Sequence, residues 1–357
     1  MSSTTFNVWH LIGLGAGYRV SMRLGVLDIG SNSAQLQIVD VTAGAPPLPA
    51  LAVKTPTMLG EEITADGSIS RTGIDRVVGA VTRSMRVAVQ QQVDQVYPFV
   101  TSAVRDAANR GEVIEAIEVG AGVRPQYLTG EEEARLTYLA AHRWYGWSAG
   151  RLLLIDIGGG SMEIVLGRDA EPNLAISVPL GAGRLTRKFL PVDPPRNKHL
   201  KALRRHVRDT LGEVVDRLRW EAGPSRIVVT SKTFKQLTRL SGAPAQRKGP
   251  FVTRRLDRAD IEAWIPRLAA LPAADRAKLP GVSSSRARQI LAGAVIANTT
   301  LKALDVGSVD LCPWALREGI ILRHVETITS HSELPLQAVT PSPAPEDDQA
   351  IVTQLRQ

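Results

Sequence analysis

The sequence predicts an α/β protein made of two similar halves that face each other across a cleft. The first observation is an internal repeat, because residues 28–33 (DIGSNS) recur as residues 156–161 (DIGGGS). Both copies follow a short apolar strand and lead into a second strand, which is the pattern of a β-hairpin. The second is that strand-like and helix-like segments alternate along the chain, which is typical of α/β folds. The third is the length of 357 residues, which accommodates two domains.

The first hairpin is followed by three helix-like segments before the second hairpin begins. Short apolar runs predict strands at residues 24–27, 36–41, 95–100 and 124–128. Apolar residues at helical spacing predict helices at residues 74–89, 104–119 and 131–145. Residues 1–21 are expected to be a leader or an upstream start outside the fold. No basic residue precedes their apolar patch, and no signal-cleavage pattern follows it.

The second half contains the second hairpin and a long amphipathic helix. Strands are predicted at residues 152–155, 164–166, 175–178, 227–230 and 309–311. Helices are predicted at residues 200–218, 261–271, 287–303 and 314–324. In the first of these helices the apolar residues step by three or four, so they share one face. Residues 330–357 carry four prolines and little apolar periodicity, which predicts a disordered tail.

Composition excludes several kinds of site. Cys312 is the only cysteine, so the chain has no intrachain disulfide, no CxxC redox pair and no cysteine-based zinc site. The six histidines show neither HxxxH nor HExxH spacing. No run of 18 apolar residues is present, so no membrane-spanning helix is predicted. A single cysteine fits a reducing compartment, and we expect a cytoplasmic protein.

Positive charge is concentrated in one segment. The formal net charge is +8, and residues 181–258 hold 20 Lys/Arg against 6 Asp/Glu. Solvated helix surfaces are usually mixed in sign, so this excess indicates a track for a polyanion. Few aromatic residues lie in the segment, which argues against nucleic acid as the partner. The cations that flank the apolar stripe of the helix at 200–218 are Lys198, Lys201, Arg204, Arg205 and Arg208.

The two repeated turns are suited to binding phosphate. Glycine lets the backbone approach a ligand, and consecutive N–H groups can converge on phosphate oxygens. An aspartate at the strand end, Asp28 or Asp156, repels phosphate but can hold Mg²⁺, which bridges carboxylate and phosphate. Strand alternation leaves two orientations for Glu163, either toward the same cleft or outward.

Two further features have two interpretations each. Residues 131–133 are three glutamates at the start of a predicted helix. They either compensate the helix dipole or present a general base to the cleft. Arg105 is either a fork that matches phosphate oxygens or an arginine on a helix surface.

Five motifs occur in order along the chain. They are residues 28–33, 101–110 (TSAVRDAANR), 129–136 (TGEEEARL), 156–163 (DIGGGSME) and 315–321 (ALREGII). Together they resemble the exopolyphosphatase and guanosine pentaphosphate phosphohydrolase family, called Ppx/GppA, in its short actinobacterial form. The resemblance implies two actin-like domains that flank a cleft, one formed by residues 22–130 and completed by a helix at 312–329, the other by residues 131–311.

The resemblance also implies roles for individual residues. Glu133 takes the position of the catalytic base, and Arg105 lies beside the phosphates. Asp28, Asp156 and Glu163 are expected to hold Mg²⁺, with Mn²⁺ as an alternative ion. The expected phosphate-binding residues are Asn32, Ser33, Gly158, Gly159, Gly160, Ser161 and Lys232.

Two departures from the family pattern shift the expected substrate. Residues 230–233 (TSKT) stand where many relatives have a glycine-rich turn, and Arg288 stands where the family usually has aspartate. Both changes add positive charge and favour a simple polyanion over a guanosine nucleotide. We therefore expect a Mg²⁺-dependent exopolyphosphatase that releases terminal orthophosphate from inorganic polyphosphate, short chains in particular. The resemblance also implies a homodimer. The alternatives are a guanosine pentaphosphate 5′-phosphohydrolase, an ATP-dependent kinase or ATPase, and a non-enzymatic polyanion-binding protein.

Overall fold

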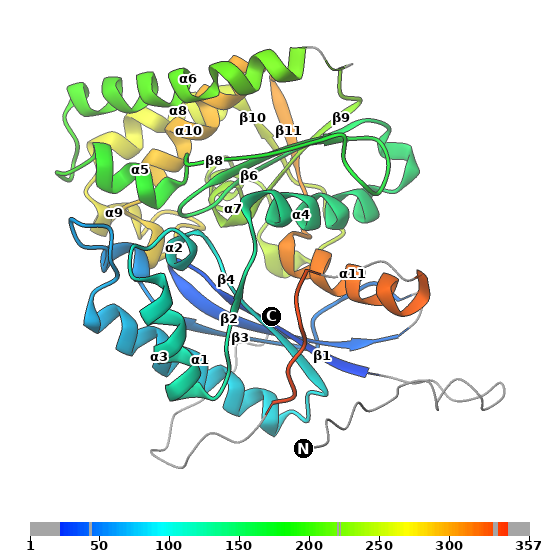
Figure 1. Ribbon diagram of the computed structural model, residues 1–357. Coiled ribbons are helices and arrows are strands. Elements are labelled where there is room, and N and C mark those ends of the chain that lie inside the picture. Colours follow the sequence, from blue (N-terminus) through cyan, green and yellow to red (C-terminus); the bar gives the residue numbers. More distant parts are fainter. Residues whose placement is uncertain (1–21, 43–44, 220, 222, 331–334, 342–357) are drawn as a thin grey trace, which may run out of the picture.

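The chain forms two β-sheets, each with its own set of helices (Figure 1). The structure is a computed structural model, and it describes residues 22–42, 45–219, 221, 223–330 and 335–341. Within these residues the first sheet has five strands in the order β3-β2-β1-β4-β5, and the second has six in the order β10-β11-β9-β6-β7-β8. No helix in the described part of the chain is long and apolar enough to cross a membrane.

The first sheet is built around the first hairpin. Its strands are β1 (Met22–Ile29), β2 (Ser33–Val41), β3 (Leu51–Pro56), β4 (Gln95–Val100) and β5 (Gln126–Tyr127). β1 pairs antiparallel with β2 and parallel with β4. Helices α1 (Arg71–Gln90) and α3 (Arg110–Ala121) pack on this sheet and bury a common apolar cluster with it.

The second sheet repeats the same arrangement. Its strands are β6 (Leu152–Ile157), β7 (Met162–Gly167), β8 (Leu174–Val178), β9 (Arg226–Thr230), β10 (Arg255–Asp257) and β11 (Ser308–Leu311). β6 pairs antiparallel with β7 and parallel with β9, as β1 does with β2 and β4. In register, Asp28 lies opposite Gln35 and Asp156 lies opposite Glu163. The repeated sequence motif therefore occupies the same place in both sheets.

The helices of the second half surround a buried central helix. They are α5 (Ala182–Phe189), α6 (Asn197–Arg219), α7 (Ser231–Leu240), α8 (Arg258–Ala270), α9 (Ala273–Arg276) and α10 (Ile290–Ala303). α10 is buried along most of its length because it packs against α6 and α8 as well as the sheet. The predicted apolar stripe of α6 is confirmed, since Leu200, Leu203, Val207, Leu211 and Val214 are all buried.

Two helices lie between the sheets and connect them. α4 (Gly130–Tyr145) packs on the second sheet, while α11 (Leu316–Ser330) packs on the first (Figure 1). They cross at Gly319, where an added Cβ would lie 1.9 Å from the Leu136 carbonyl oxygen. The expected domain boundaries at residues 130 and 311 stay predictions.

The predicted helix at residues 104–119 is wrong as a single element. The structure has α2 (Ser102–Arg105) and then α3, with a turn between them. Asn109 accounts for the break, because its side chain accepts from the Ile69 N–H (2.8 Å) and donates to the Ile69 carbonyl (3.0 Å). A side chain that bonds a distant backbone in this way competes with continued helix.

Several short elements were missed by the sequence patterns. They are β3, β10, α5, α7, α9 and the 3₁₀ turns at Leu59–Glu61, Trp147–Ala149, Gln246–Lys248 and Ser284–Arg286. α5 (AGRLTRKF) and α7 (SKTFKQLTRL) carry too few apolar residues for their periodicity to be visible in a short window. β3 lies at a sheet edge, where half-exposed residues dilute the strand pattern.

Part of the predicted disordered tail is ordered. Val339 exchanges two backbone hydrogen bonds of 2.8 Å with Val96 of β4, and Leu336 is buried. The two-residue strand β5 pairs only with the last part of β4, so this segment occupies the edge that β5 leaves free. Residues 331–334 and 342–357 lie outside the described residues, as does the expected leader at 1–21.

We predict that Gly319→Ala destabilises the protein by separating α4 from α11. The added methyl group would overlap the backbone of α4, and overpacking of this kind costs about 1–3 kcal/mol in free energy of unfolding. Gly212→Ala on the exposed face of α6 is the control, because nothing lies near its Cβ and alanine favours helix. Chemical denaturation measures both. Equal stability of Gly319→Ala and the parent would contradict the close crossing.

Candidate active site

Each hairpin ends in a turn that follows an aspartate. The turns are closed by hydrogen bonds from the Gly30 N–H to the Ser33 carbonyl (3.1 Å) and from the Gly158 N–H to the Ser161 carbonyl (3.0 Å). The carbonyls of the second turn are anchored by α5, whose amides at Ala182 and Arg184 donate to Gly158 and Gly159. Two equivalent turns are therefore fixed at corresponding edges of the two sheets.

The turn at residues 158–161 lies directly against the first half of the chain. A Cβ on Gly159 would lie 2.1 Å from Ser31 Oγ, and one on Gly160 would lie 2.3 Å from Ser102 Oγ. Only glycine allows this approach, because any larger side chain would push the turns apart. The predicted glycine run thus brings the backbones of the two halves together.

A cavity of about 170 Å³, hereafter the catalytic cavity, lies where the turns meet. Most residues predicted for the site line it, namely Asp28, Asn32, Ser33, Glu133, Asp156, Gly158, Gly159, Ser161 and Lys232. Arg105, Gly160 and Glu163 do not line it. Nine of the twelve predicted site residues therefore line one cavity, whose walls come from both halves of the chain.

The three consecutive glutamates at the start of α4 have different partners. Glu132 forms a capping box with Thr129, and the Thr129 N–H donates to the Glu132 carboxylate over 2.7 Å. Glu131 is exposed and pairs with Arg135 at 2.8 Å. Glu133 alone reaches the catalytic cavity. The acidic run therefore divides: Glu132 caps the helix, and Glu133 faces the cavity, where the general-base role stays a prediction.

Arg105 contacts the carboxylate of Glu133 and does not enter the cavity. Its guanidinium donates to Glu133 Oε2 (3.1 Å), to the Leu128 carbonyl (3.0 Å) and to Asp106 Oδ1 (3.2 Å). It lies at the end of α2, so this short helix positions it beside the first turn of α4. The contacts fix the orientation of Glu133 from behind.

Burial raises the pKa of Glu133 to about 7. The Arg105 guanidinium acts against this rise, while the negative charges of Asp156 and Asp28 add to it. A carboxyl group that titrates near neutral pH is suited to accept a proton from water. Glu133 is therefore the general-base candidate that the geometry favours.

Asp28 and Asp156 lie at matching strand ends and both face the cavity. Burial raises the pKa of each carboxyl group, against nearby positive charges. Asp28 Oδ2 lies 3.8 Å from Arg317, and Asp156 accepts a hydrogen bond from Thr230 Oγ1. The two carboxylates come from opposite halves and have free oxygen capacity toward the cavity.

Glu163 does not line the cavity, although it interacts with Glu133 and Asp156, which do, and its place among the metal ligands stays a prediction. It is 3% exposed and accepts a 2.9 Å hydrogen bond from Ser177 Oγ. Burial, with the charges of Glu133 and Asp156 close by, raises its pKa well above the usual range. Strand register places Glu163 opposite Asp156 on one side and opposite Ser177 of β8 on the other, so the three side chains share one face of the sheet.

Among the described residues, no three His, Cys, Asp or Glu side chains form a ready-made metal-binding cluster. Mg²⁺ usually needs only one or two carboxylates, because water and substrate phosphates supply its remaining ligands. Asp28 and Asp156 fit that pattern, since both face the cavity and neither has its charge fully neutralised by a close ion pair.

Four cations line the same cavity. They are Lys232, Lys235, Arg286 and Arg317. Burial lowers the pKa of Lys232 to about 6, helped by the charges of Lys54, Arg317 and Arg286. Burial also lowers the pKa of Lys235 and Arg286. The sequence patterns assigned no role to Lys235 or Arg317. For Arg317 a signal was present, because it lies within the family motif at residues 315–321 (ALREGII).

Asn32 connects the two halves through its side chain. Its Oδ1 accepts a 2.9 Å hydrogen bond from Gln289, and its Nδ2 donates to Ser31 Oγ over 3.0 Å. The residue is buried. Its amide is therefore committed to holding the turns together, in addition to lining the cavity.

Lys232 is placed by an unusual backbone conformation. Ser231, the first residue of α7, has a φ of +83°, in the region that favours glycine. This is the turn where the sequence (TSKT) departs from the expected glycine-rich pattern. The departure keeps the glycine-type backbone while adding a lysine to the cavity wall.

Comparison with known proteins agrees with this geometry. The model of the Ppx/GppA phosphatase family matches residues 37–328. Exopolyphosphatase 1 of Mycobacterium tuberculosis is 44% identical over 306 residues, which cover 86% of this chain and 89% of the relative.

Solved structures show the same fold. A Ppx/GppA family member from Aquifex aeolicus superposes with a TM-score of 0.71 at 27% identity, covering 87% of this chain and 99% of that one. An exopolyphosphatase from Cytophaga hutchinsonii gives a TM-score of 0.77 at 23% identity, covering 85% and 98%. The two sheets with their helices are thus two actin-like domains that flank a cleft.

We predict that anion binding protonates Lys232. With a pKa of about 6 this side chain is mostly neutral at pH 7.5, and a bound anion favours its charged form. Tripolyphosphate binding to the Glu133→Gln protein should therefore take up as much as about one more proton than binding to Glu133→Gln/Lys232→Met. Calorimetry in two buffers of different ionisation enthalpy measures the difference. Equal proton uptake by both proteins would contradict the assignment.

Proposed function

The chain belongs to the Ppx/GppA phosphatase family, and from this premise we propose that it is an exopolyphosphatase. The reaction is the hydrolytic release of terminal orthophosphate from inorganic polyphosphate. The observation that carries the proposal is the catalytic cavity itself, where one carboxylate of near-neutral pKa faces several cations. A site of that kind suits attack by water on a highly charged phosphate chain.

The terminal phosphate would lie between the two turns at residues 30–33 and 158–161. Backbone amides there, together with Arg286 and Arg317, would offset the charge of its oxygens. Glu133 would orient a water molecule and accept its proton at a carboxylate oxygen as the anhydride bond breaks. Arg105 keeps that carboxylate directed into the cavity through its 3.1 Å hydrogen bond. It acts as a positioning residue.

Asp28 and Asp156 would hold Mg²⁺, with Mn²⁺ as an alternative. The ion would supply further positive charge at the phosphate oxygens. Glu163 would support the ion as a third carboxyl group beside Asp156, whose strand partner it is, and burial favours its neutral form until a cation is present.

The lining of the catalytic cavity supports inorganic polyphosphate over a nucleotide. It contains no aromatic side chain among its described residues, so nothing there can stack on a base. Lys232 adds a charge at the turn that lies against adenosine in the wider superfamily. A cytoplasmic location stays a prediction from the single cysteine, and a homodimer stays a prediction of the resemblance.

We predict that Glu133→Gln abolishes most turnover and leaves substrate binding intact. Loss of a general base lowers kcat by about 10²- to 10⁴-fold, while glutamine keeps the shape of the side chain. Orthophosphate release with Mg²⁺ is measured from tripolyphosphate, long polyphosphate, guanosine pentaphosphate and ATP. Glu131→Gln is the matched control, because Glu131 lies two residues away and is exposed.

Near-normal turnover by Glu133→Gln would remove this residue from the mechanism. Release mainly from guanosine pentaphosphate would replace the proposed substrate with a guanosine nucleotide. Tight binding of polyphosphate without release from any compound would identify a binding protein.

We predict that kcat/KM decreases as the pH is lowered below about 7, because Glu133 must be ionised to accept a proton. The decrease should approach about tenfold per pH unit on the acidic side. Arg105 lowers the pKa of Glu133, so Arg105→Gln should move this acidic limb of the pH profile to higher pH. Arg124→Gln, at an exposed arginine that pairs with Glu118, should leave it in place. A limb that does not move in Arg105→Gln would contradict the positioning role.

A further inference from the structure

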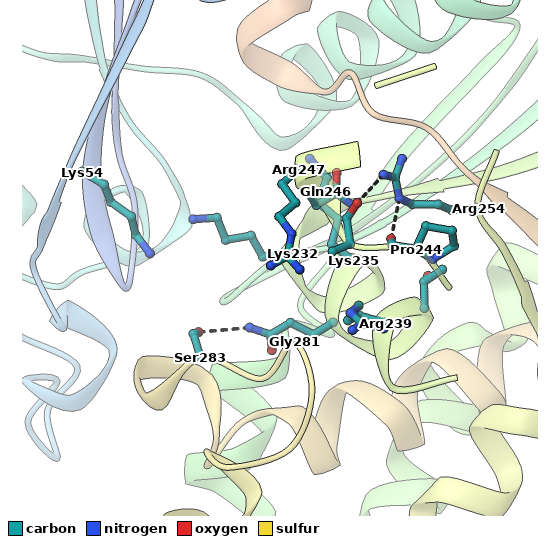
Figure 2. Close-up of a pocket in the computed structure, with 13 residues that line it drawn as sticks. Lys54, Lys232, Lys235, Arg239, Pro244, Gln246, Arg247, Arg254, Gly281 and Ser283 are labelled. Atoms are coloured by element: carbon teal, nitrogen blue, oxygen red, sulfur yellow. Dashed lines mark hydrogen bonds between the residues drawn. The ribbon is translucent and has the colours of Figure 1, made fainter. Parts of the chain in front are cut away.

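A second cavity of about 470 Å³ adjoins the catalytic cavity and is lined by positive side chains (Figure 2). We call it the basic cavity. Its cations are Lys54, Lys232, Lys235, Arg239, Arg247 and Arg254. No Asp or Glu occurs among the described residues that line it. Such a one-sign surface concentrates anions.

Three of these cations are already committed to the backbone. Arg254 is buried and donates to four carbonyls between residues 244 and 252. Arg239 donates to the Ala243 carbonyl over 3.1 Å, and Lys235 to the Pro313 carbonyl over 3.3 Å. These contacts shape the cavity, and they leave the other cations to meet a ligand.

Lys54, Lys232 and Arg247 have no anionic partner among the described residues. Lys54 projects from β3 of the first sheet toward Lys232 on α7 of the second (Figure 2). The two ammonium groups are close enough that Lys54 lowers the pKa of Lys232. An anion between these two amino groups would favour the charged form of Lys232, which burial and Lys54 otherwise disfavour.

The basic cavity adjoins the catalytic cavity and shares two lining residues with it. Lys232 and Lys235 line both. A linear polyanion with one end between the two turns would therefore pass these lysines and enter the basic cavity. The described lining contains no aromatic side chain, so it suits phosphate groups and offers no platform for a base.

The basic face of α6 is a poorer candidate for the same role. Lys201 and Arg204 lie on an exposed surface of the second half, and neither lines a cavity that contains a predicted catalytic residue. In Figure 1 α6 runs along the outer edge of the molecule, remote from the first sheet. The segment predicted as a polyanion track thus divides into an outer helix and a cavity next to the site.

We propose that the basic cavity binds inner phosphate groups of the same polyphosphate chain whose terminal phosphate lies in the catalytic cavity. This inference rests on the proposed function. It assigns Lys54 and Arg247 as residues that set the preference for chain length.

The test compares Lys54→Gln/Arg247→Gln with the parent on tripolyphosphate and on a sized fraction of long polyphosphate. Both residues are exposed, so the variant is expected to fold. Two lost charge contacts should lower kcat/KM on long chains by about tenfold, through KM, and on tripolyphosphate by less than about twofold. Binding of long chains should also become less sensitive to salt, because fewer counterions are released.

Lys201→Gln/Arg204→Gln is the matched control, because it removes the same charge from α6. It should leave kcat/KM on both substrates within about twofold of the parent. A larger effect of the control on long chains would place the chain on α6 and overturn the inference. Equal loss on both substrates in Lys54→Gln/Arg247→Gln would also overturn it.

A pyrophosphate titration distinguishes the substrate chain from a free ligand of the same chemistry. One outcome is that pyrophosphate alters tripolyphosphate hydrolysis by the parent and not by Lys54→Gln/Arg247→Gln, while the variant shows no loss specific to long chains. The cavity then binds a separate ligand, and the inference fails. Failure of the proposed function gives a different result, since the parent would then release no orthophosphate from either polyphosphate.

Discussion

The contact between the two hairpin turns is the constraint on which the site depends. It gathers carboxylates from both halves of the chain into one buried region, and burial raises the pKa of each. These carboxylates are Asp28, Glu133, Asp156 and Glu163. An isolated buried charge is costly, so cations must offset it. Arg105, Arg286 and Arg317 arrive from three other elements, and the balance exists only while the halves are together.

One turn of α11 connects this charge balance to the packing between the sheets. Arg317 lies 3.8 Å from Asp28, Glu318 accepts a 2.9 Å hydrogen bond from Gln37 of β2, and Gly319 allows the close approach of α4. Glu318 also accepts from the Ala315 N–H, which fixes the start of the helix. Three consecutive residues thus serve the site, the first sheet and the helix crossing. A shift of α11 would disturb all three.

The sequence predicted the repeated hairpins and the long helices because their apolar periods and glycine turns are local features. The sequence also distinguishes Glu132 from its two neighbours, because the spacing of Thr129 and Glu132 is that of a capping box. It did not reveal that Glu163 turns toward Ser177, because strand alternation leaves both faces of a buried sheet open. Lys235 reaches the cavity only through packing between distant elements, which no local pattern records, whereas the motif at residues 315–321 offered a signal for Arg317.

The distribution of basic residues shows the same limit in another way. A count of charge over residues 181–258 treats α6 and α7 alike, although the cations of α6 lie on an outer surface and those of α7 line the cavities. Solvent screens the first group, so its effect on a bound chain is weak. Lys232 on α7 is half-buried beside Lys54 and Arg286, where charges interact more strongly. An anion gains most where cations already repel one another, and in this chain that place adjoins the catalytic cavity.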